Sequence, residues 1–357
     1  MLKAPIQYSS ALEEPKPSED ATIKKLNGHF REIMDTTLKD NGHAIRGVHA
    51  KSHGVLKGTL TVKENLQSDL AQGLFATPGE HEVTLRMSTN AGDILHDRIP
   101  LPRGLAMKVH DVDGERLPDA EGRTQDFIFL NAPAFPAPDA DAFESNLAML
   151  AKTTDRVEWL KKVAAETLGA INSAREAVGL GSSPALASLG GVPNLQPLGE
   201  TYYSATAFRF GDHVAKFRLV PTAEWMIALE GEEVNVAGRH DGIREEVRIQ
   251  MQSNAAQWAM QVQLLRDLDA QPIEDASAEW SEDVSPFTTV ASIDAPVQDA
   301  WLPTKVDEVN EHLRFSVWTG LEAHRPLGNI NRARKETYAQ SSSYRERANG
   351  CPIHEPG

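Results

Sequence analysis

The sequence predicts an α+β protein, built as an eight-stranded antiparallel β-barrel with helical insertions and a C-terminal helical segment. Two observations predict this fold class. Several short segments alternate apolar and polar residues, as strands with one buried face do, and the clearest is EVTLRMST at 82–89, where Val83, Leu85 and Met87 share one side. Other segments, placed between and after these, carry apolar residues at helical spacing.

The expected strands are bounded mostly by Gly, Pro, Asp or Asn, and they lie at 54–62, 82–89, 104–112, 126–130, 205–210, 215–220, 259–265 and 287–293. Strands of this number and length favour a closed antiparallel barrel. Helices are expected within 139–178, 306–320 and the polar stretch 329–347. We therefore divide the chain into an extended arm (1–20), a single domain (21–347) with a helical insertion at about 139–200, and a tail (348–357).

Composition limits the possible partners. The chain of 357 residues is 40% hydrophobic, which is enough to bury a large core. Its 36 basic and 51 acidic residues give a formal charge of -15, which argues against nucleic acid as a partner. No apolar run approaches the roughly 18 residues that a membrane span needs. The lone Cys351 excludes an internal disulfide, and the first residues lack a secretory pattern, so we expect a cytoplasmic protein.

His49 is the first candidate for chemistry. It lies in the run RGVHAK at 46–51, just before an expected strand, from where its ring could point into the barrel. A histidine can act as a general acid and base because its ordinary pKa lies near neutrality. A single histidine among 12 is, however, more often a surface or structural residue.

Arg334 and Tyr338 form the second candidate. They are four residues apart in the polar C-terminal stretch, so they share a helix face, and Arg345 follows two turns later. A neighbouring arginine favours the phenolate form of tyrosine, which is a hard anionic ligand able to hold ferric iron. Taken alone, such a pair is usually a surface pair.

Four motifs in a fixed order strengthen the case that these candidates are functional residues. They are Arg-x-Val-His-Ala-Lys at 46–51, Arg-x-Ser-Thr at 86–89, Pro-Arg-Gly-x-Ala-x-Lys at 102–108 and Asn-x-Pro-x-Phe at 131–135. With the Arg-x-x-x-Tyr at 334–338 they resemble segments of catalases, in catalase order. The resemblance spans roughly 40–347, without contribution from 145–200. It is closest to the short catalase-related haem proteins, which lack the C-terminal flavodoxin-like domain of large catalases.

The resemblance implies haem b as cofactor, with Tyr338 as the ligand of its iron. It implies His49, Asn131 and Ser88 as catalytic residues: His49 moves the peroxide proton, Asn131 steadies the leaving oxygen and Ser88 orients the His49 ring. The remaining haem contacts implied are Arg46, Val48, Arg86, Phe143, Arg334 and Arg345, of which Arg46, Arg86 and Arg345 match propionate-binding arginines. The Asn-x-Pro segment can be aligned one residue further along, so the register around Asn131 and Phe143 stays open. The implied activity is that of a homo-oligomeric catalase or peroxidase, a dimer or tetramer.

Two departures from large catalases bear on the substrate. Leu101 stands where they carry a channel aspartate, and Asn90 stands where they carry an apolar residue. Losing the carboxylate makes entry less selective for hydrogen peroxide and more open to an alkyl chain. An alternative function is therefore the conversion of a fatty-acid hydroperoxide, by a hydroperoxide lyase or allene oxide synthase type of reaction. Val48, which true catalases also carry before the histidine, favours hydrogen peroxide.

Two further alternatives remain. The barrel could hold haem or a lipid without turnover, although a carrier has no need of His49, Ser88 and Asn131 together. Cys351 and His354 could ligate a metal or the haem iron, although two residues in a tail do not make a site.

Overall fold

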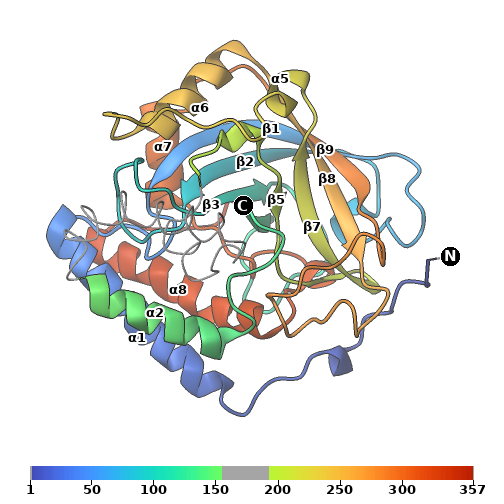
Figure 1. Cartoon of the computed structure of the whole chain (residues 1–357). Helices are drawn as coiled ribbons and strands as arrows, with labels where there is room; N and C mark the ends of the chain where they lie inside the picture. The colour runs from blue at the N-terminus through green and yellow to red at the C-terminus, as the bar shows by residue number, and fades with distance from the viewer. Residues whose placement is uncertain (1, 155–192, 357) are drawn as a thin grey trace, which may run out of the picture.

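The computed structural model describes residues 2–154 and 193–356. The described strands form one antiparallel sheet in the order β5-β4-β3-β2-β1-β9-β8-β7-β6, and an additional pairing of β5 with β7 closes it. The predicted eight-stranded barrel is confirmed, with β6 as an extra strand paired to β7 (Figure 1). The strands are β1 (Ser52–Val62), β2 (Glu80–Thr89), β3 (Arg103–Val109), β4 (Gln125–Leu130), β5 (Tyr202–Tyr203), β6 (Phe208–Phe210), β7 (His213–Pro221), β8 (Ala256–Leu264) and β9 (Thr288–Ala295).

Apolar side chains from the alternating segments fill the interior of the barrel. Leu85 and Met87 of β2, Leu105 of β3 and Phe129 of β4 all belong to the largest buried apolar cluster. An eight-stranded barrel has an interior just wide enough for side chains. The residues between them, such as Arg86, therefore project from the outer face of the barrel.

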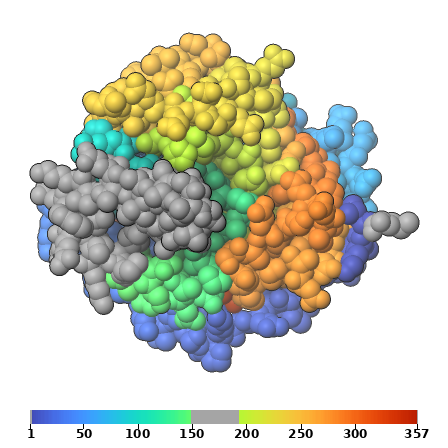
Figure 2. Space-filling model, viewed as in Figure 1, coloured from blue at the N-terminus to red at the C-terminus, as the bar shows by residue number. Residues whose placement is uncertain are grey.

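Helices cover that outer face. The longer ones are α1 (Glu19–Asn41), α2 (Ala140–Thr154), α6 (Gly242–Ser253) and α8 (Asn329–Asn349), with α5 (Glu224–Ile227), α7 (Pro303–Asp307) and the π-helical turn η4 (Glu308–His312) shorter. Short 3-10 turns are η1 (Ser10–Leu12), η2 (Gly73–Phe75), η3 (Pro197–Gly199) and η5 (Glu322–His324). In Figure 1, α8 lies between the barrel and the pair α1 and α2, and Figure 2 shows α2 in green directly against α1 in blue. No helix in the described ranges is long and apolar enough to cross a membrane.

The expected helices are found in part. The stretch 329–347 is helical, and the helix ends where Gly350 adopts the left-handed conformation that glycine tolerates. For the expected helix at 139–178, α2 covers 140–154, and 155–192 lie outside the described residues. The expected helix at 306–320 is wrong beyond residue 312, because arginine side chains bind the carbonyls of Val309, Asn310 and Leu313 that a continuing helix would need.

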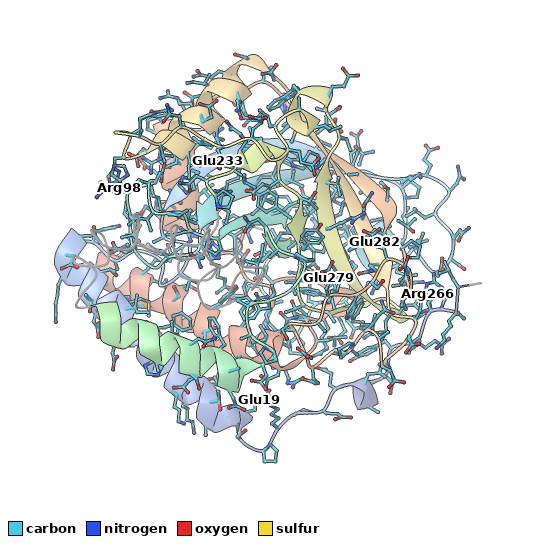
Figure 3. The ribbon with its side chains drawn as sticks, viewed as in Figure 1. Glu19, Arg98, Glu233, Arg266, Glu279 and Glu282 are labelled. Carbon is cyan, nitrogen blue, oxygen red and sulfur yellow. The ribbon has the colours of Figure 1, made fainter. Side chains whose placement is uncertain are left out.

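The N-terminal arm and α1 are tied to the rest of the chain. The arm pairs with its own barrel, where the Ile6 and Tyr8 amides donate to the carbonyls of Leu265 and Asp212. Arg332 of α8 donates to three carboxylates, Glu13 of the arm, Glu19 of α1 and Glu274. Figure 3 labels Glu19 at the start of α1. This cluster fixes α1 against α8, and α1 itself was not expected from the sequence.

Candidate active site

A cavity lies between the outer face of β2–β4, the segment 46–49 that precedes β1, and the helices α1, α2 and α8. Its larger chamber has a volume of about 690 Å³, and a smaller chamber adjoins it. Both chambers are lined by Phe30, Val48, His49, Ile128, Thr337 and Tyr338, so they lie side by side. The expectation that the His49 ring points into the barrel is wrong, because this cavity lies outside the barrel wall. A volume of this size falls in the range of cofactor and ligand sites, about 300–1,000 Å³.

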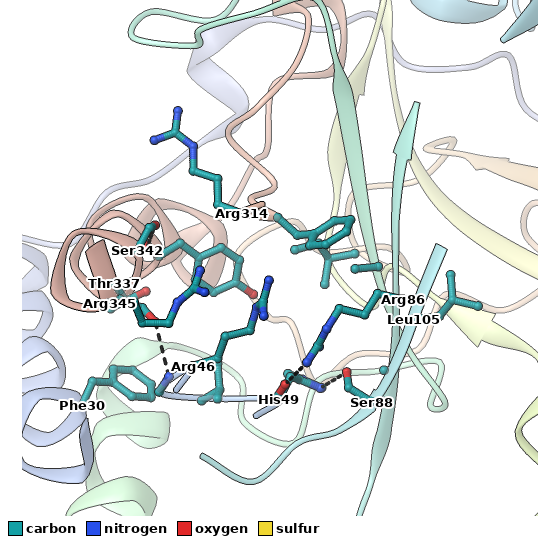
Figure 4. Close-up of a pocket in the computed structure, with 18 of the residues that line it drawn as sticks. Phe30, Arg46, His49, Arg86, Ser88, Leu105, Arg314, Thr337, Ser342 and Arg345 are labelled. Carbon is teal, nitrogen blue, oxygen red and sulfur yellow. Dashed lines mark hydrogen bonds between the residues drawn. The ribbon is translucent and has the colours of Figure 1, made fainter. Parts of the chain in front are cut away.

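His49 is held by its backbone and by its ring. Its φ of 52° is left-handed, a conformation that histidine adopts more readily than most residues, and its amide donates to the Asn90 carbonyl at 3.1 Å. Nδ1 of the ring lies 3.1 Å from Oγ of Ser88 (Figure 4). A Cβ on Gly104 would lie 2.6 Å from Cε1 of His49, so the ring needs glycine at that position. The predicted pairing of His49 with Ser88 is thus present in the geometry.

The environment keeps His49 neutral. Burial, together with the charges of Arg86, Arg334 and Arg46, lowers the pKa of His49 to about 3. A neutral imidazole can accept a proton from a bound molecule. The residue is therefore suited to act first as a base and then, once protonated, as an acid.

Four arginines line the smaller chamber, and one of them, Arg314, forms ion pairs with Glu121 and Glu355. The other three are Arg46, Arg86 and Arg345. Figure 4 shows them grouped between α8 and the barrel strands. Burial lowers the pKa of Arg345 to about 10. Burial and the nearby Arg345 lower the pKa of Arg86 to about 9. No Asp or Glu within the described ranges lies within 4.0 Å of the guanidinium nitrogens of Arg46, Arg86 or Arg345, and Glu311 acts on Arg46 and Arg345 only from a greater distance. The three positive charges are therefore not paired directly.

Two more residues of α8, Arg334 and Tyr338, line the cavity beside Arg345. Tyr338 lines both chambers, and its hydroxyl makes no hydrogen bond within the described part of the chain. Arg334 lines the larger chamber, donates to Oδ1 of Asn331 at 3.1 Å and lies over the Phe135 ring, 5.3 Å from its centroid. Helical spacing thus brings Arg334 and Tyr338 to one cavity, but no hydrogen bond joins them.

Asn131 also lines the larger chamber, although both ends of its amide are in use. Its Oδ1 accepts from the Arg103 amide at 2.9 Å, and its Nδ2 donates to Glu200 at 2.8 Å. Glu200 in turn forms an ion pair with Arg103. By contrast, Oδ1 of Asn90 is buried in the same cavity and has no hydrogen-bond partner among the described residues. The cavity therefore contains a fixed amide and a free one.

Of the remaining predicted residues, some line the cavity and others do not. Phe143 of α2 lines the larger chamber and packs against Phe135, with ring centroids 5.3 Å apart, and Val48 lines both chambers. Leu101 lines neither chamber, while its neighbour Pro102 does. Sγ of Cys351 lies 3.5 Å from Nδ1 of His312, and Cys351 lines neither chamber. No group of three or more His, Cys, Asp or Glu in the described residues could hold a metal ion.

Sequence reasoning missed three residues of this region. Phe30 lines both chambers, and the helical spacing of Leu26, Phe30 and Met34 could have revealed its helix. Glu200 holds Asn131, and Asn310 binds the arginines. Neither has a local sequence signal, because each role depends on residues far away in the chain.

Comparison with known proteins gives the fold. No protein-family model matches the sequence, and no curated protein matches it. Among solved structures, a fungal catalase superposes with a TM-score of 0.61 at 16% identity, over 90% of this chain and 64% of its own. Catalase A from Saccharomyces cerevisiae gives 0.60 at 18%, over 90% and 66%, and a bacterial catalase gives 0.57 at 16%, over 98% and 66%. The chain spans 64 to 66% of the length of these catalases. It therefore has the catalase fold.

Proposed function

We propose that this chain binds haem b in the cavity, with Tyr338 as the ligand of the iron, and that it processes a peroxide with His49 as acid and base. One observation carries the proposal. Arg46, Arg86 and Arg345 line the smaller chamber of the cavity, and no carboxylate of the described residues forms an ion pair with them. Uncompensated buried cations are costly, and a bound anion would offset that cost.

The residues present fit the two propionate groups and the apolar ring of haem b. Nε of Arg345 is buried without a hydrogen-bond partner in the described part of the chain, so a donor is available for a ligand carboxylate. Apolar side chains such as Phe30, Ile128 and Phe143 line the space where a flat ring would pack. Bound haem would supply an iron centre that accepts a peroxide.

The protein residues would then move and hold protons. Neutral His49 takes a proton from the peroxide oxygen and returns it to the leaving oxygen. Ser88 fixes the ring through Nδ1, so that Nε2 is the nitrogen left to exchange the proton. A cavity amide donates a hydrogen bond to the leaving oxygen. Asn131 is the amide that the catalase resemblance implies for this role, and it would use the second Nδ2 hydrogen, which Glu200 does not bind.

An absorbance spectrum tests the proposal. Protein expressed with haem supply should show a high-spin ferric Soret band, and a colourless product would overturn the proposal. Tyr338→Phe should lose haem or change the spectrum, whereas Tyr344→Phe on the same helix should not, because the Tyr344 hydroxyl binds Asp35 instead. His49→Ala should keep the haem and lose peroxide turnover. If Tyr338→Phe bound haem with an unchanged spectrum, Tyr338 would not be the ligand.

A second candidate reaction is the conversion of an organic hydroperoxide, such as that of a fatty acid. The observation that favours it is the larger chamber, whose lining from α1, α2 and α8 is mostly apolar, including Leu26, Ala140 and Ile330. Such a lining accepts an alkyl chain at little desolvation cost. Oxygen release from hydrogen peroxide should be compared with loss of the conjugated-diene absorbance of a linoleate hydroperoxide. The faster reaction identifies the substrate.

We also propose a homo-oligomer, a dimer or tetramer, on the strength of the likeness to catalases. Light scattering of the purified protein tests this, and a monomer would contradict it.

A further inference from the structure

The guanidinium groups of Arg46, Arg86 and Arg345 converge on one residue, Asn310. Arg46 and Arg345 donate to the Asn310 carbonyl at 2.8 and 2.7 Å, and Nε of Arg86 donates to Oδ1 of the Asn310 side chain at 2.9 Å. Asn310 does not line either chamber, so it lies behind the arginines as seen from the cavity.

The π-helical turn η4 makes this arrangement possible. Carbonyls that a regular α-helix would use internally are here directed to the arginines, at Val309, Asn310 and Leu313. Val309 packs against Val55 of β1, which anchors the turn to the barrel. Turns of this kind are rare and occur often at functional sites.

All the acceptors of the three arginines within the described residues are neutral. They are backbone carbonyls and one side-chain amide, including the His49 and Ala50 carbonyls bound by Arg86. Glu311, the acidic residue nearest in sequence to Asn310, places Oε2 at 2.7 Å from Nε2 of His43, and it acts on Arg46 and Arg345 only from beyond 4.0 Å. Neutral acceptors fix the direction of a guanidinium group without cancelling its charge. An aspartate in place of Asn310 would fix the same direction and cancel the charge.

We infer that Asn310 is a positioning residue, which aims Arg46 and Arg345 through its backbone carbonyl and Arg86 through its side-chain amide at the two carboxylates of the bound porphyrin. Its side chain is neutral so that the charge of the arginines remains available to these carboxylates. This inference rests on the proposed haem binding. It adds a residue and a reason for its chemical type, which the likeness to catalases does not provide.

The test compares Asn310→Asp with Asn65→Asp, which adds the same charge on an exposed loop. Haem affinity is measured by titration of the apoprotein followed in the Soret band, and apoprotein stability by thermal melting. The carboxylate introduced by Asn310→Asp would lie close to the propionates, and we expect haem affinity to fall by roughly 10- to 100-fold. The melting temperature of the apoprotein should rise, because the new carboxylate compensates buried cations. Asn65→Asp should change neither quantity.

A second probe isolates the charge effect. Haem dimethyl ester has no free carboxylates, so Asn310→Asp and the original protein should bind it equally well. A merely structural Asn310 predicts that Asn310→Asp, which keeps the acceptor, binds haem as tightly as the original protein, and that result would overturn the inference. If Asn310→Asp fails to fold, Asn310→Ala serves in its place. Its loss of affinity should appear with haem and not with the ester, and equal losses with both would refute positioning. Absence of haem binding by the original protein would instead refute the proposed function itself.

Discussion

The low pKa of His49 leads to a prediction about pH. With a pKa of about 3, about 99% of the His49 rings are neutral at pH 5. With the ordinary value near 6.5, only about 3% would be neutral at that pH. If His49 is the base, the rate of peroxide consumption at pH 5 should therefore be close to the rate at pH 8. An ordinary histidine would give a ratio of about 0.03.

Burial is the largest cause of the low pKa, ahead of the charges of Arg86, Arg334 and Arg46. The prediction therefore persists when bound propionates neutralise the arginines in part. Haem-loaded protein is assayed from about pH 4.5 to about pH 8.5 at a peroxide concentration well below saturation, with the Soret band recorded at each pH to confirm that haem is retained. His49→Ala should be slower by roughly 100- to 10,000-fold across the whole range. A loss of rate centred near pH 6.5, with an unchanged Soret band, would refute the reasoning from burial.

Three further predictions concern residues around the cavity and the core. Ser88→Ala should slow turnover by about 2- to 10-fold at unchanged haem content, since one neutral hydrogen bond contributes about 0.5–1.5 kcal/mol; an unchanged rate would show that the ring needs no hydroxyl. In urea denaturation, Asn131→Leu should lower the free energy of unfolding by about 1–3 kcal/mol, because it deprives buried polar groups of their hydrogen-bond partner. Asn90→Leu should not lower it, because the side-chain oxygen that it removes has no hydrogen-bond partner among the described residues. Equal losses would contradict this distinction. Lys108→Met should lower the same free energy by about 3–5 kcal/mol, because it leaves the buried carboxylates of Asp126 and Glu355 without their ammonium group, and a loss below about 1 kcal/mol would contradict the pairing.

The strands are the part of the fold that local sequence predicts best. Each expected strand overlaps an observed one, because burial of a single face imposes an alternation that is visible within a few residues, as in β2. Strand β5 is two residues long and was not expected, since such a segment cannot display a period. Helix α1 was not expected either. It carries many charged residues, and its start, Glu19, falls in the stretch 1–20 that we expected to be an extended arm.

The candidate site could be predicted where motifs carry it. Short motifs identified His49, Ser88 and Arg86, and the cavity brings them together with Tyr338 and Arg345. The hydrogen-bond partners of these residues could not be predicted from the sequence. Asn310 lies more than 200 residues from Arg86, and its role depends on a π-helical turn for which no sequence signal is known. The backbone carbonyls that bind the arginines cannot be predicted from the sequence either, since every residue type carries one.

The acidic composition and the basic cavity act over different distances. The formal charge of -15 is spread over the chain, and salt screens exposed charges beyond about 8 Å, so a long polyanion laid along the surface would meet mainly repulsion. A small dianion inside the cavity would instead be within direct reach of Arg46, Arg86 and Arg345. Their charge persists there because neutral acceptors hold them and, within the described residues, no carboxylate pairs with them. Net charge therefore bears on surface partners alone, and the choice of amide over carboxylate at Asn310 governs what the cavity can bind.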